Sequence, residues 1–351
     1  MIAASVPVAS TNAAEGEEAR RGIRWWLLFL ILLSFGMVLV GGATRLTESG
    51  LSITEWNLVS GTFPPLTSEA WQSEFDLYQR SPQYKLLNEG MSLASFKTIY
   101  WWEWAHRELG RFIGIVYIAG FLWFVGRRAV PLRAALALAG VGILLGLQGV
   151  VGWIMVASGL EPGVTAVAPM KLTLHLTLAS LFLAALVSLY VRFGGAQPEP
   201  ATRGQRSGVW ALVVLALVQI ALGGLVAGHR AGLTYNTWPL MDGRLIPNGL
   251  ALLEPLWVNA VGNITTVQFN HRLGAYVLAA AILAYAVATR RRSRPVLARA
   301  LLLSILILAQ LVIGILTLVS VVPIGLALMH QAMAMILLFV LTWNASVARA
   351  G

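Results

Sequence analysis

Eight long apolar runs constrain this chain more than any other feature of its sequence. Each run has about 18 or more residues, the length that crosses a bilayer, and 58% of the 351 residues are hydrophobic while 11% are charged. Lipid offers the backbone no hydrogen-bond partner, so runs of this length favour helices over barrel strands. The sequence predicts an all-α integral membrane protein with eight transmembrane helices, near residues 25–43, 107–125, 133–156, 172–192, 208–228, 271–289, 297–319 and 324–346.

The distribution of positive charge predicts the orientation of these spans. Lysine and arginine are concentrated in the first 24 residues and in the loops on the same side of the membrane, whereas the opposite side is close to neutral. Both termini are therefore expected on the cytoplasmic side of a bacterial inner (plasma) membrane, or on the matrix side of the mitochondrial inner membrane. The same bias accounts for the net charge of +10, so a nucleic acid partner is not indicated. The chain has no cysteine, which excludes disulfides and thiolate ligands.

Matching residues in the two parts of the chain predict an internal repeat. Gly41-Gly42 matches Gly223-Gly224, and after these the order of further matches is the same in both parts: Gly50-Leu51 with Gly232-Leu233, Trp56 with Trp238, His106 with His271, Gln148 with Gln310, and His175 with His330. Each part supplies an even number of spans, so the two are expected to be parallel four-helix halves related by a pseudo-twofold axis along the membrane normal.

The repeat gives the expected organisation of the chain. It comprises a cytoplasmic tail (1–24), a first half (25–192) with a large outer loop (44–105), a cytoplasmic linker (193–207), a second half (208–346) and a C-terminal tail (347–351).

Four histidines are expected at similar depth near the outer face. His106 and His271 open the second and sixth predicted spans, and His175 and His330 lie about one turn into the fourth and eighth. A haem with two axial imidazoles needs one histidine on each side of its ring, whereas a tetrahedral zinc site would need further ligands that neither half supplies. The alternative for each histidine is an interhelical hydrogen bond or an interfacial position. His229 matches Thr47 in the repeat and is interpreted as interfacial rather than as a ligand.

Small and basic residues near these histidines are compatible with a haem. Arg107 and Arg272 directly follow two of the histidines, and Arg111 lies one turn after the first of them. Guanidinium groups at this depth could pair with haem propionates, although anchoring of a helix end is an equally good interpretation. Glycines in these spans could leave room for a flat ring, or could serve ordinary helix packing: Gly110, Gly114, Gly146, Gly149, Gly152 and Gly274.

The position three residues before the first histidine of each half differs between the halves. It is Glu103 in the first and Gln268 in the second. A carboxylate can accept a proton or stabilise positive charge on a reacting carbon, whereas an amide does not take a proton at ordinary pH. The first half is therefore predicted to react and the second to hold a cofactor, unless Glu103 only pairs with Arg107 or with a lysine of the outer loop.

Several long motifs resemble those of the haem A synthases, in particular the cysteine-free branch that includes mitochondrial members. They include "GGATRLTESGLSITEWNLVSGTFPP", "YWWEWAHRELGR", "LQGVVGWIMVASGL", "GLTYNTWPLMDG" and "FNHRLGAY", and the resemblance covers about residues 25–345. It implies an oxidoreductase acting on a CH group, which oxidises the C8 methyl of haem O to a formyl group through an alcohol and so makes haem A for terminal oxidases.

The resemblance also implies roles for the site residues. His271 and His330 would be axial ligands of one haem B in the second half, His106 and His175 would hold the haem O substrate, and Glu103 would be the catalytic carboxylate. The expected partners are the lipid bilayer, a haem O synthase and an electron acceptor or donor that the sequence does not identify. A membrane di-haem electron-transfer protein and a haem carrier remain the alternatives, and the difference between Glu103 and Gln268 argues for the enzyme.

Overall fold

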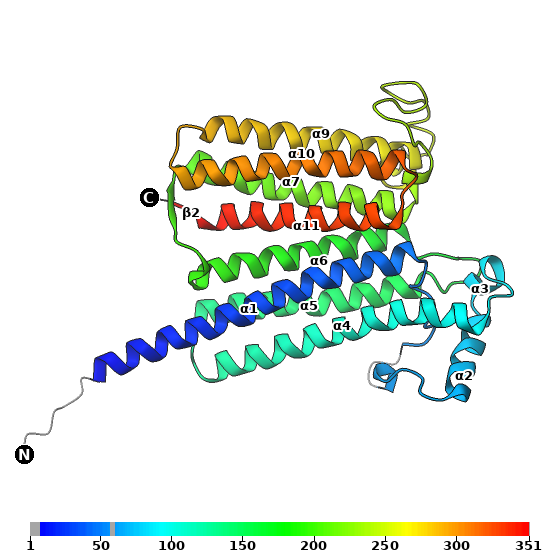
Figure 1. Cartoon of the computed structure of the whole chain (residues 1–351), viewed down its shortest axis with the longest axis horizontal. Helices are drawn as coiled ribbons and strands as arrows, with labels where there is room; N and C mark the ends of the chain where they lie inside the picture. The colour runs from blue at the N-terminus through cyan, green and yellow to red at the C-terminus, as the bar shows by residue number, and fades with distance from the viewer. Residues whose placement is uncertain (1–7, 57–59, 351) are drawn as a thin grey trace, which may run out of the picture.

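The computed structural model describes residues 8–56 and 60–350, and it consists mainly of long helices (Figure 1). Within this part of the chain, eight helices are long and apolar enough to cross a membrane. They are α1 (Val8–Leu46), α4 (Leu93–Gly126), α5 (Leu132–Ala157), α6 (Pro169–Tyr190), α7 (Arg203–Gly228), α9 (Ile264–Thr289), α10 (Arg294–Val319) and α11 (Ile324–Val347). The predicted all-α membrane fold with eight spans is confirmed.

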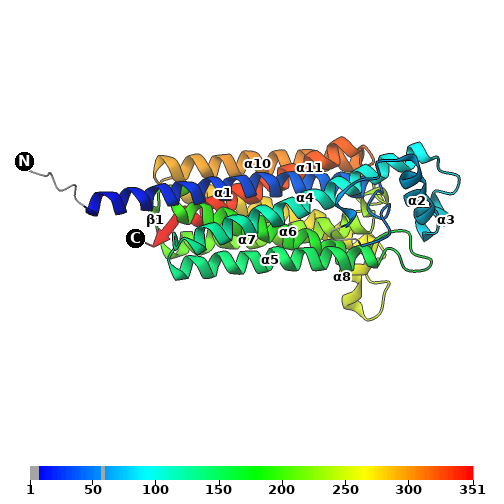
Figure 2. The same cartoon turned by 90° about the horizontal axis from the view of Figure 1, so that it is seen from below.

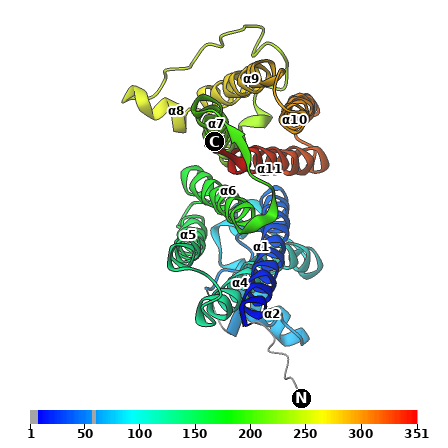
Figure 3. The ribbon, with the colours of Figure 1, turned by 90° about the vertical axis from the view of Figure 1, so that its left-hand side faces the viewer.

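The eight helices form a central group and two flanking pairs. Viewed along the bundle, α1, α6, α7 and α11 lie in the middle, with α4 and α5 on one side and α9 and α10 on the other (Figure 3). In the most apolar stretch of each helix, 39–44% of the residues of α1, α6 and α7 are buried, against 11% for α4, α5 and α10. The flanking helices therefore expose leucine and isoleucine side chains on the surface that faces lipid in a membrane.

Corresponding helices make corresponding contacts in the two halves. In the first half α1 packs on α4 and α6, and α5 packs on α6; in the second half α7 packs on α9 and α11, and α10 packs on α11. Between the halves, α6 contacts α7 and α1 contacts α11. This pattern supports the predicted parallel repeat, which stays a prediction.

At the outer end, α4 continues beyond the bundle and carries the large outer loop (Figure 2). The loop contains α2 (Ser68–Gln79) and α3 (Pro82–Leu87). A buried aromatic cluster joins them to the first turns of α4, and it consists of Trp71, Phe75, Tyr78, Phe96 and Tyr100. The helix therefore begins at Leu93, well before the predicted span at 107, because its first turns are stabilised by aromatic packing rather than by lipid.

The second half has a shorter outer segment with little regular structure. Short helical segments lie in the connections of both halves, at Ser60–Thr62, Val191–Gly195, Ala231–Leu233, Leu256–Val258 and α8 (Asn259–Gly262).

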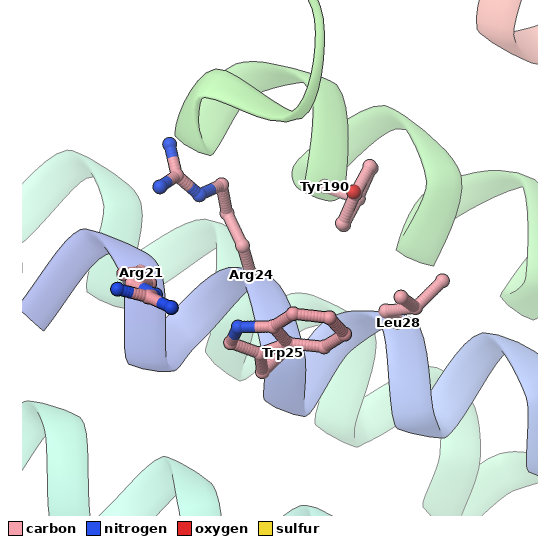
Figure 4. A pocket seen from close by; sticks show the side chains of 5 residues that line it. All are labelled: Arg21, Arg24, Trp25, Leu28 and Tyr190. Atoms are coloured by element: carbon pink, nitrogen blue, oxygen red, sulfur yellow. The ribbon is translucent and has the colours of Figure 1, made fainter.

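At the end of the bundle opposite the loop with α2 and α3, the linker and the C-terminal tail pair with each other. Strand β1 (Glu199–Ala201) lies parallel to β2 (Ala348–Ala350), and Arg299 forms an ion pair with Glu199. A pocket of about 190 Å³ lies between α1 and the last residue of α6, and it is lined by Arg21, Arg24, Trp25, Leu28 and Tyr190 (Figure 4). These contacts secure the two basic inner segments of the chain, at the end of the bundle away from the outer loops.

Candidate functional site

Each of the four histidines lies on a different helix and is partly buried. His106 is on α4, His175 on α6, His271 on α9 and His330 on α11. Glu103 and His106 both lie within α4, so the expected placement of the two on neighbouring positions of one helix is observed. His106 does not open its helix as the sequence suggested, because α4 already begins at Leu93.

Every one of these histidines packs against a glycine of the adjacent helix. A Cβ atom added to Gly41 would lie 2.7 Å from Cε1 of His106, and one added to Gly152 would lie 2.8 Å from Cε1 of His175. In the second half the corresponding distances are 3.2 Å from Gly223 to His271 and 2.7 Å from Gly314 to His330. All four distances are close to or below the usual limit for such contacts, so the backbone at these glycines lets neighbouring helices approach the rings.

The other predicted glycines differ in what they contact. Gly152 lies beside His175, as described, and Gly274 lies beside Gln219 of α7. Gly110 lies near the methyl group of Met37, whereas Gly114, Gly146 and Gly149 have no heavy atom within 4 Å of an added Cβ. Among these, the close contact with a histidine ring belongs to Gly152.

The two rings of the second half have the spacing of an axial pair. The centroids of His271 and His330 are 6.4 Å apart, with the ring planes at 79°. A metal at about 2 Å from each imidazole nitrogen requires ring centroids roughly 6 Å apart. The residues of the second half therefore fit a haem iron held between two imidazoles. Within residues 8–56 and 60–350, no group of three or more His, Cys, Asp or Glu side chains that could hold a metal ion comes together.

Glutamines lie beside three of the four rings. Nε2 of Gln148 is 3.3 Å from Nε2 of His175, and Nε2 of Gln310 is 3.5 Å from Nε2 of His330. Nε2 of Gln219 is 3.1 Å from Nδ1 of His271. Within the part of the chain that the structure describes, several buried polar atoms of the four histidines and the three glutamines have no hydrogen-bond partner: Nδ1 of His106, His175 and His330, and Oε1 of Gln148, Gln219 and Gln310. Unpaired buried polar atoms are uncommon in native proteins, and their concentration here indicates a site that a ligand completes.

Glu103 is buried in a network that joins α4 to the outer loop. Its Oε2 accepts hydrogen bonds from the hydroxyl of Ser52 and from the backbone N–H of Ile53, both at 2.8 Å. Its Oε1 accepts from Nε and Nη2 of Arg107, at 3.1 and 2.6 Å. The pairing of Glu103 with Arg107, considered above as an alternative to catalysis, is therefore present.

Arg107 also holds the outer loop directly. Its guanidinium donates to the carbonyl oxygens of Ile53 at 2.7 Å and Glu55 at 3.1 Å, and it lies 5.1 Å from the ring centroid of Trp56. The Glu103–Arg107 pair thus fixes the loop segment 52–56 next to the helical turn that carries His106.

The second half builds the same connection from an amide and an arginine. Nε2 of Gln268 donates to the carbonyl oxygens of Ala231 at 3.0 Å and Tyr235 at 3.2 Å. Arg272 donates to the carbonyl oxygens of Tyr235 and Thr237, each at 2.9 Å. The outer segment after α7 is held to α9 as the segment after α1 is held to α4, without a buried carboxylate.

The arginines predicted as propionate contacts are already engaged with protein groups. Arg111 forms an ion pair with Glu108 and donates to the carbonyl oxygen of Gly61 at 3.3 Å. Nε of Arg272 is buried without a partner. Arg107 and Arg111 line an outer cleft of about 410 Å³ together with Glu55 and Glu74. Burial, and to a smaller degree the charge of Glu55, raise the pKa of Glu74, an effect that Arg107 partly offsets.

The fifth histidine is bonded to the protein backbone. Nε2 of His229 lies 2.7 Å from the carbonyl oxygen of Val261. This contact is compatible with the interfacial role predicted for it.

Sequence reasoning did not single out Gln219, Met37 or Ser52. Gln219 follows the constant offset that relates Gly41 to Gly223, and its counterpart at that offset is Met37. Comparison along the repeat could have identified this pair, whereas the bond from Ser52 to Glu103 depends on a loop conformation that has no sequence signature.

The fold and site together define a polytopic membrane protein with two pairs of imidazoles, one pair spaced as axial ligands of a haem. The chain belongs to the haem A synthase family, described as cytochrome oxidase assembly protein, whose model matches residues 24–342. Relatives named "Heme A synthase" are similar over nearly their whole length. Those from Methylorubrum populi and Methylobacterium sp. (strain 4-46) are each 51% identical, covering 95% and 94% of this chain and 88% and 93% of the relative. The relative from Methylobacterium nodulans is 53% identical over 90% of this chain and 89% of its own length.

Proposed function

We propose that this protein is a haem A synthase, an oxidoreductase that converts the C8 methyl group of haem O to a formyl group through an alcohol. The observation that carries this proposal is the similarity to haem A synthases over almost the entire chain, at 51% identity with the relative from Methylorubrum populi. The paired histidines are the groups that haem chemistry requires. The product would supply terminal oxidases.

The two histidine pairs are assigned to different haems. His271 and His330 are proposed as axial ligands of one resident haem B, because their rings are 6.4 Å apart. His106 and His175 are proposed to hold the haem O substrate, because Glu103 lies in their half. A haem held by His271 and His330 would supply one-electron redox chemistry to the site.

Glu103 is proposed as the catalytic carboxylate. Four hydrogen bonds occupy its two oxygens, and its side chain is 3% exposed. These donors favour an electrostatic role, in which the buried carboxylate stabilises positive charge that develops on the reacting carbon. Arg107 holds the carboxylate in place, and Arg107, Arg111 and Arg272 are proposed to contact the haem propionates.

The cellular setting follows from the same proposal. The protein is expected in the bacterial inner membrane, or in its mitochondrial equivalent, with both termini on the cytoplasmic or matrix side, as the basic inner segments indicate. A haem O synthase is the expected source of substrate, and an electron acceptor or donor, not identified by the sequence, is expected as a further partner.

The test is to express the protein with a source of haem O and to analyse the extracted haems by chromatography and mass. The wild type is expected to yield haem A or its alcohol intermediate. Glu103→Gln is expected to convert haem O at least 100-fold more slowly while still binding haem. Gln268→Glu is the matched control, because it places a carboxylate at the equivalent position of the second half. This variant is not expected to make the second half oxidise haem O.

The outcome also separates the alternatives. Unmodified haem O in the wild type, at full haem loading, would favour a haem carrier or an electron-transfer protein. Normal conversion by a haem-loaded Glu103→Gln variant would refute the role assigned to Glu103 while leaving the enzyme in place.

A further inference from the structure

The surroundings of His271 and His106 differ at one position of the repeat. On α7, Gln219 reaches the ring of His271, whereas the equivalent position on α1 is Met37. The methyl group of Met37 lies 3.3 Å from the place of a Cβ on Gly110, one turn along α4 from His106. One half thus places an amide beside its ligand, and the other half places a thioether near the same level.

Gln219 is held firmly beside His271. Its Nε2 lies 3.1 Å from Nδ1 of His271 and donates to the carbonyl oxygen of the same residue at 2.9 Å. Its Oε1 is buried and has no partner. A Cβ on Gly274 would lie 2.3 Å from that oxygen, so the glycine leaves room for the amide end of Gln219.

An imidazole that binds a metal through Nε2 carries its proton on Nδ1. This proton is usually donated to an acceptor, which fixes the ring and makes the imidazole a stronger ligand. Nδ1–H of His271 gains an acceptor when the Gln219 amide turns so that its Oε1 faces Nδ1. The hydrogen bond from Nε2 to the carbonyl oxygen of His271 is then exchanged for one from Nδ1–H to Oε1.

His106 has no comparable acceptor. Its Nδ1 is buried without a partner and faces the backbone of α1, at 3.2 Å from the place of a Cβ on Gly41. A thioether is only a weak acceptor. An iron bound to His106 would therefore be held by a ligand that lacks the support Gln219 gives to His271.

We propose that Gln219 and Met37 are positioning residues that set how long each site keeps its haem. Gln219 makes the His271 site retentive, as a resident cofactor requires, and Met37 leaves the His106 site exchangeable, as a substrate site requires. This inference rests on the proposed function, because it takes the first half as the site that must release a product.

The experiment measures the loss of haem from the purified full-length protein in detergent, using excess apomyoglobin as the acceptor. Each site is followed alone, in chains that lack the other ligand pair: His106→Ala with His175→Ala, or His271→Ala with His330→Ala. Haem B is the probe for the second half, and haem O is the probe for the first. The reduction potential and the absorption spectrum of the bound haem are recorded on the same samples.

Gln219→Met is expected to speed the loss of haem from the second site by 10- to 100-fold and to raise its reduction potential. Gln219→Glu, which keeps an acceptor of the same shape, is expected to retain the haem and to lower the potential. Met37→Gln is expected to slow the loss of haem O from the first site at least 10-fold. A merely structural role for Gln219 would not give opposite potential shifts for Met and Glu.

Unchanged loss rates and potentials in both Gln219→Met and Met37→Gln would overturn the inference. If the chains with truncated ligand pairs do not fold, the Gln219→Met and Gln219→Glu comparison is made in the otherwise intact protein, where the same opposite shifts are required. The haem B measurements need no turnover, so they can support or refute the role of Gln219 even if the protein proves not to make haem A.

Discussion

The two halves connect a histidine-bearing helix to an outer loop in the same way, but the first half uses a carboxylate where the second half uses an amide. In the first half a buried carboxylate, Glu103, accepts hydrogen bonds from Ser52, Ile53 and Arg107. In the second half an amide, Gln268, donates to two backbone carbonyls. The backbone of each loop therefore presents the groups that its partner needs, which are donors for the carboxylate and acceptors for the amide.

This comparison separates scaffold from chemistry. Holding the loop next to the ligand does not require a buried carboxylate, since the second half does it with the amide of Gln268 and the guanidinium of Arg272. The carboxylate of the first half is thus additional to the structural need, and this difference supports a reactive role for the first half. The predictions below test how much the charge contributes and how the halves differ around their ligands.

The largest expected effect comes from removing the buried carboxylate. Glu103→Leu leaves the guanidinium of Arg107, 11% exposed, without its ion partner, and breaking a buried pair costs about 3–5 kcal/mol. Gln268→Leu removes neutral hydrogen bonds and is expected to cost about 1–3 kcal/mol. The free energy of unfolding in mixed detergent micelles measures both. Equal losses in the two halves would show that the charge of the Glu103 pair adds nothing, and the double variant with Arg107→Met is expected to recover part of the loss.

The next effect concerns the glycines beside the rings. Gly41→Ala would place a Cβ 2.7 Å from the ring of His106, whereas Gly223→Ala leaves 3.2 Å to His271. Overpacking costs about 1–3 kcal/mol, and alanine recovers up to about 1 kcal/mol through its helix propensity. Gly41→Ala is therefore expected to destabilise the protein and to displace His106, while Gly223→Ala is expected to be nearly neutral. Thermal unfolding and haem loading check this order, which a larger effect of Gly223→Ala would contradict.

Much of this arrangement could be predicted from the sequence, because the bilayer imposes it. Apolar runs of fixed length define the eight spans, and the repeat of His106 and His175 in His271 and His330 identified the candidate ligands before their spacing was known. The sequence also predicts the glycine beside His175. It predicts the same role for Gly146 and Gly149, but a Cβ added at either position has no heavy atom within 4 Å.

Other features could not be predicted, because they depend on tertiary contacts. Hydropathy placed the start of the second span at 107, but packing of Phe96 and Tyr100 against α2 extends the helix to Leu93. The bonds from Ser52 and Ile53 to Glu103 depend on the path of an irregular loop, which has no periodic pattern to read. The pairing of Gln219 with His271 could be predicted only with knowledge of the contact between α7 and α9 and of the rotamer of Gln219.

A smaller effect is expected from the hydroxyl that contacts the carboxylate. Ser52→Ala removes one of the four donors to Glu103 and is expected to cost about 1–2 kcal/mol, since the acceptor is charged. Thr234 occupies the equivalent position of the second half and is exposed, so Thr234→Ala is expected to change stability by less than about 0.5 kcal/mol. Thermal unfolding of the two variants measures the difference. A loss of similar size in both would indicate that the hydroxyl acts on the loop and not on the carboxylate.

The smallest expected effect tests the outer cleft, which adjoins the charged network of the first half. Burial raises the pKa of Glu74 above its value in the unfolded chain, so the folded state favours the protonated form. Ionisation of Glu74 therefore lowers the free energy of unfolding as the pH rises above the pKa of the unfolded chain, about 4.3. Glu74→Gln keeps the shape of the side chain and removes this penalty, so it is expected to slow hydrogen exchange in α2 at pH 7. The factor is expected to be small, because solvent screens the charge of a half-exposed group. At about pH 3 and below, where Glu74 is protonated in both states, the variant and the wild type are expected to exchange alike. Faster exchange in the variant at pH 7 would mean that attraction to Arg107 outweighs burial, and that the charged network of the first half extends to Glu74.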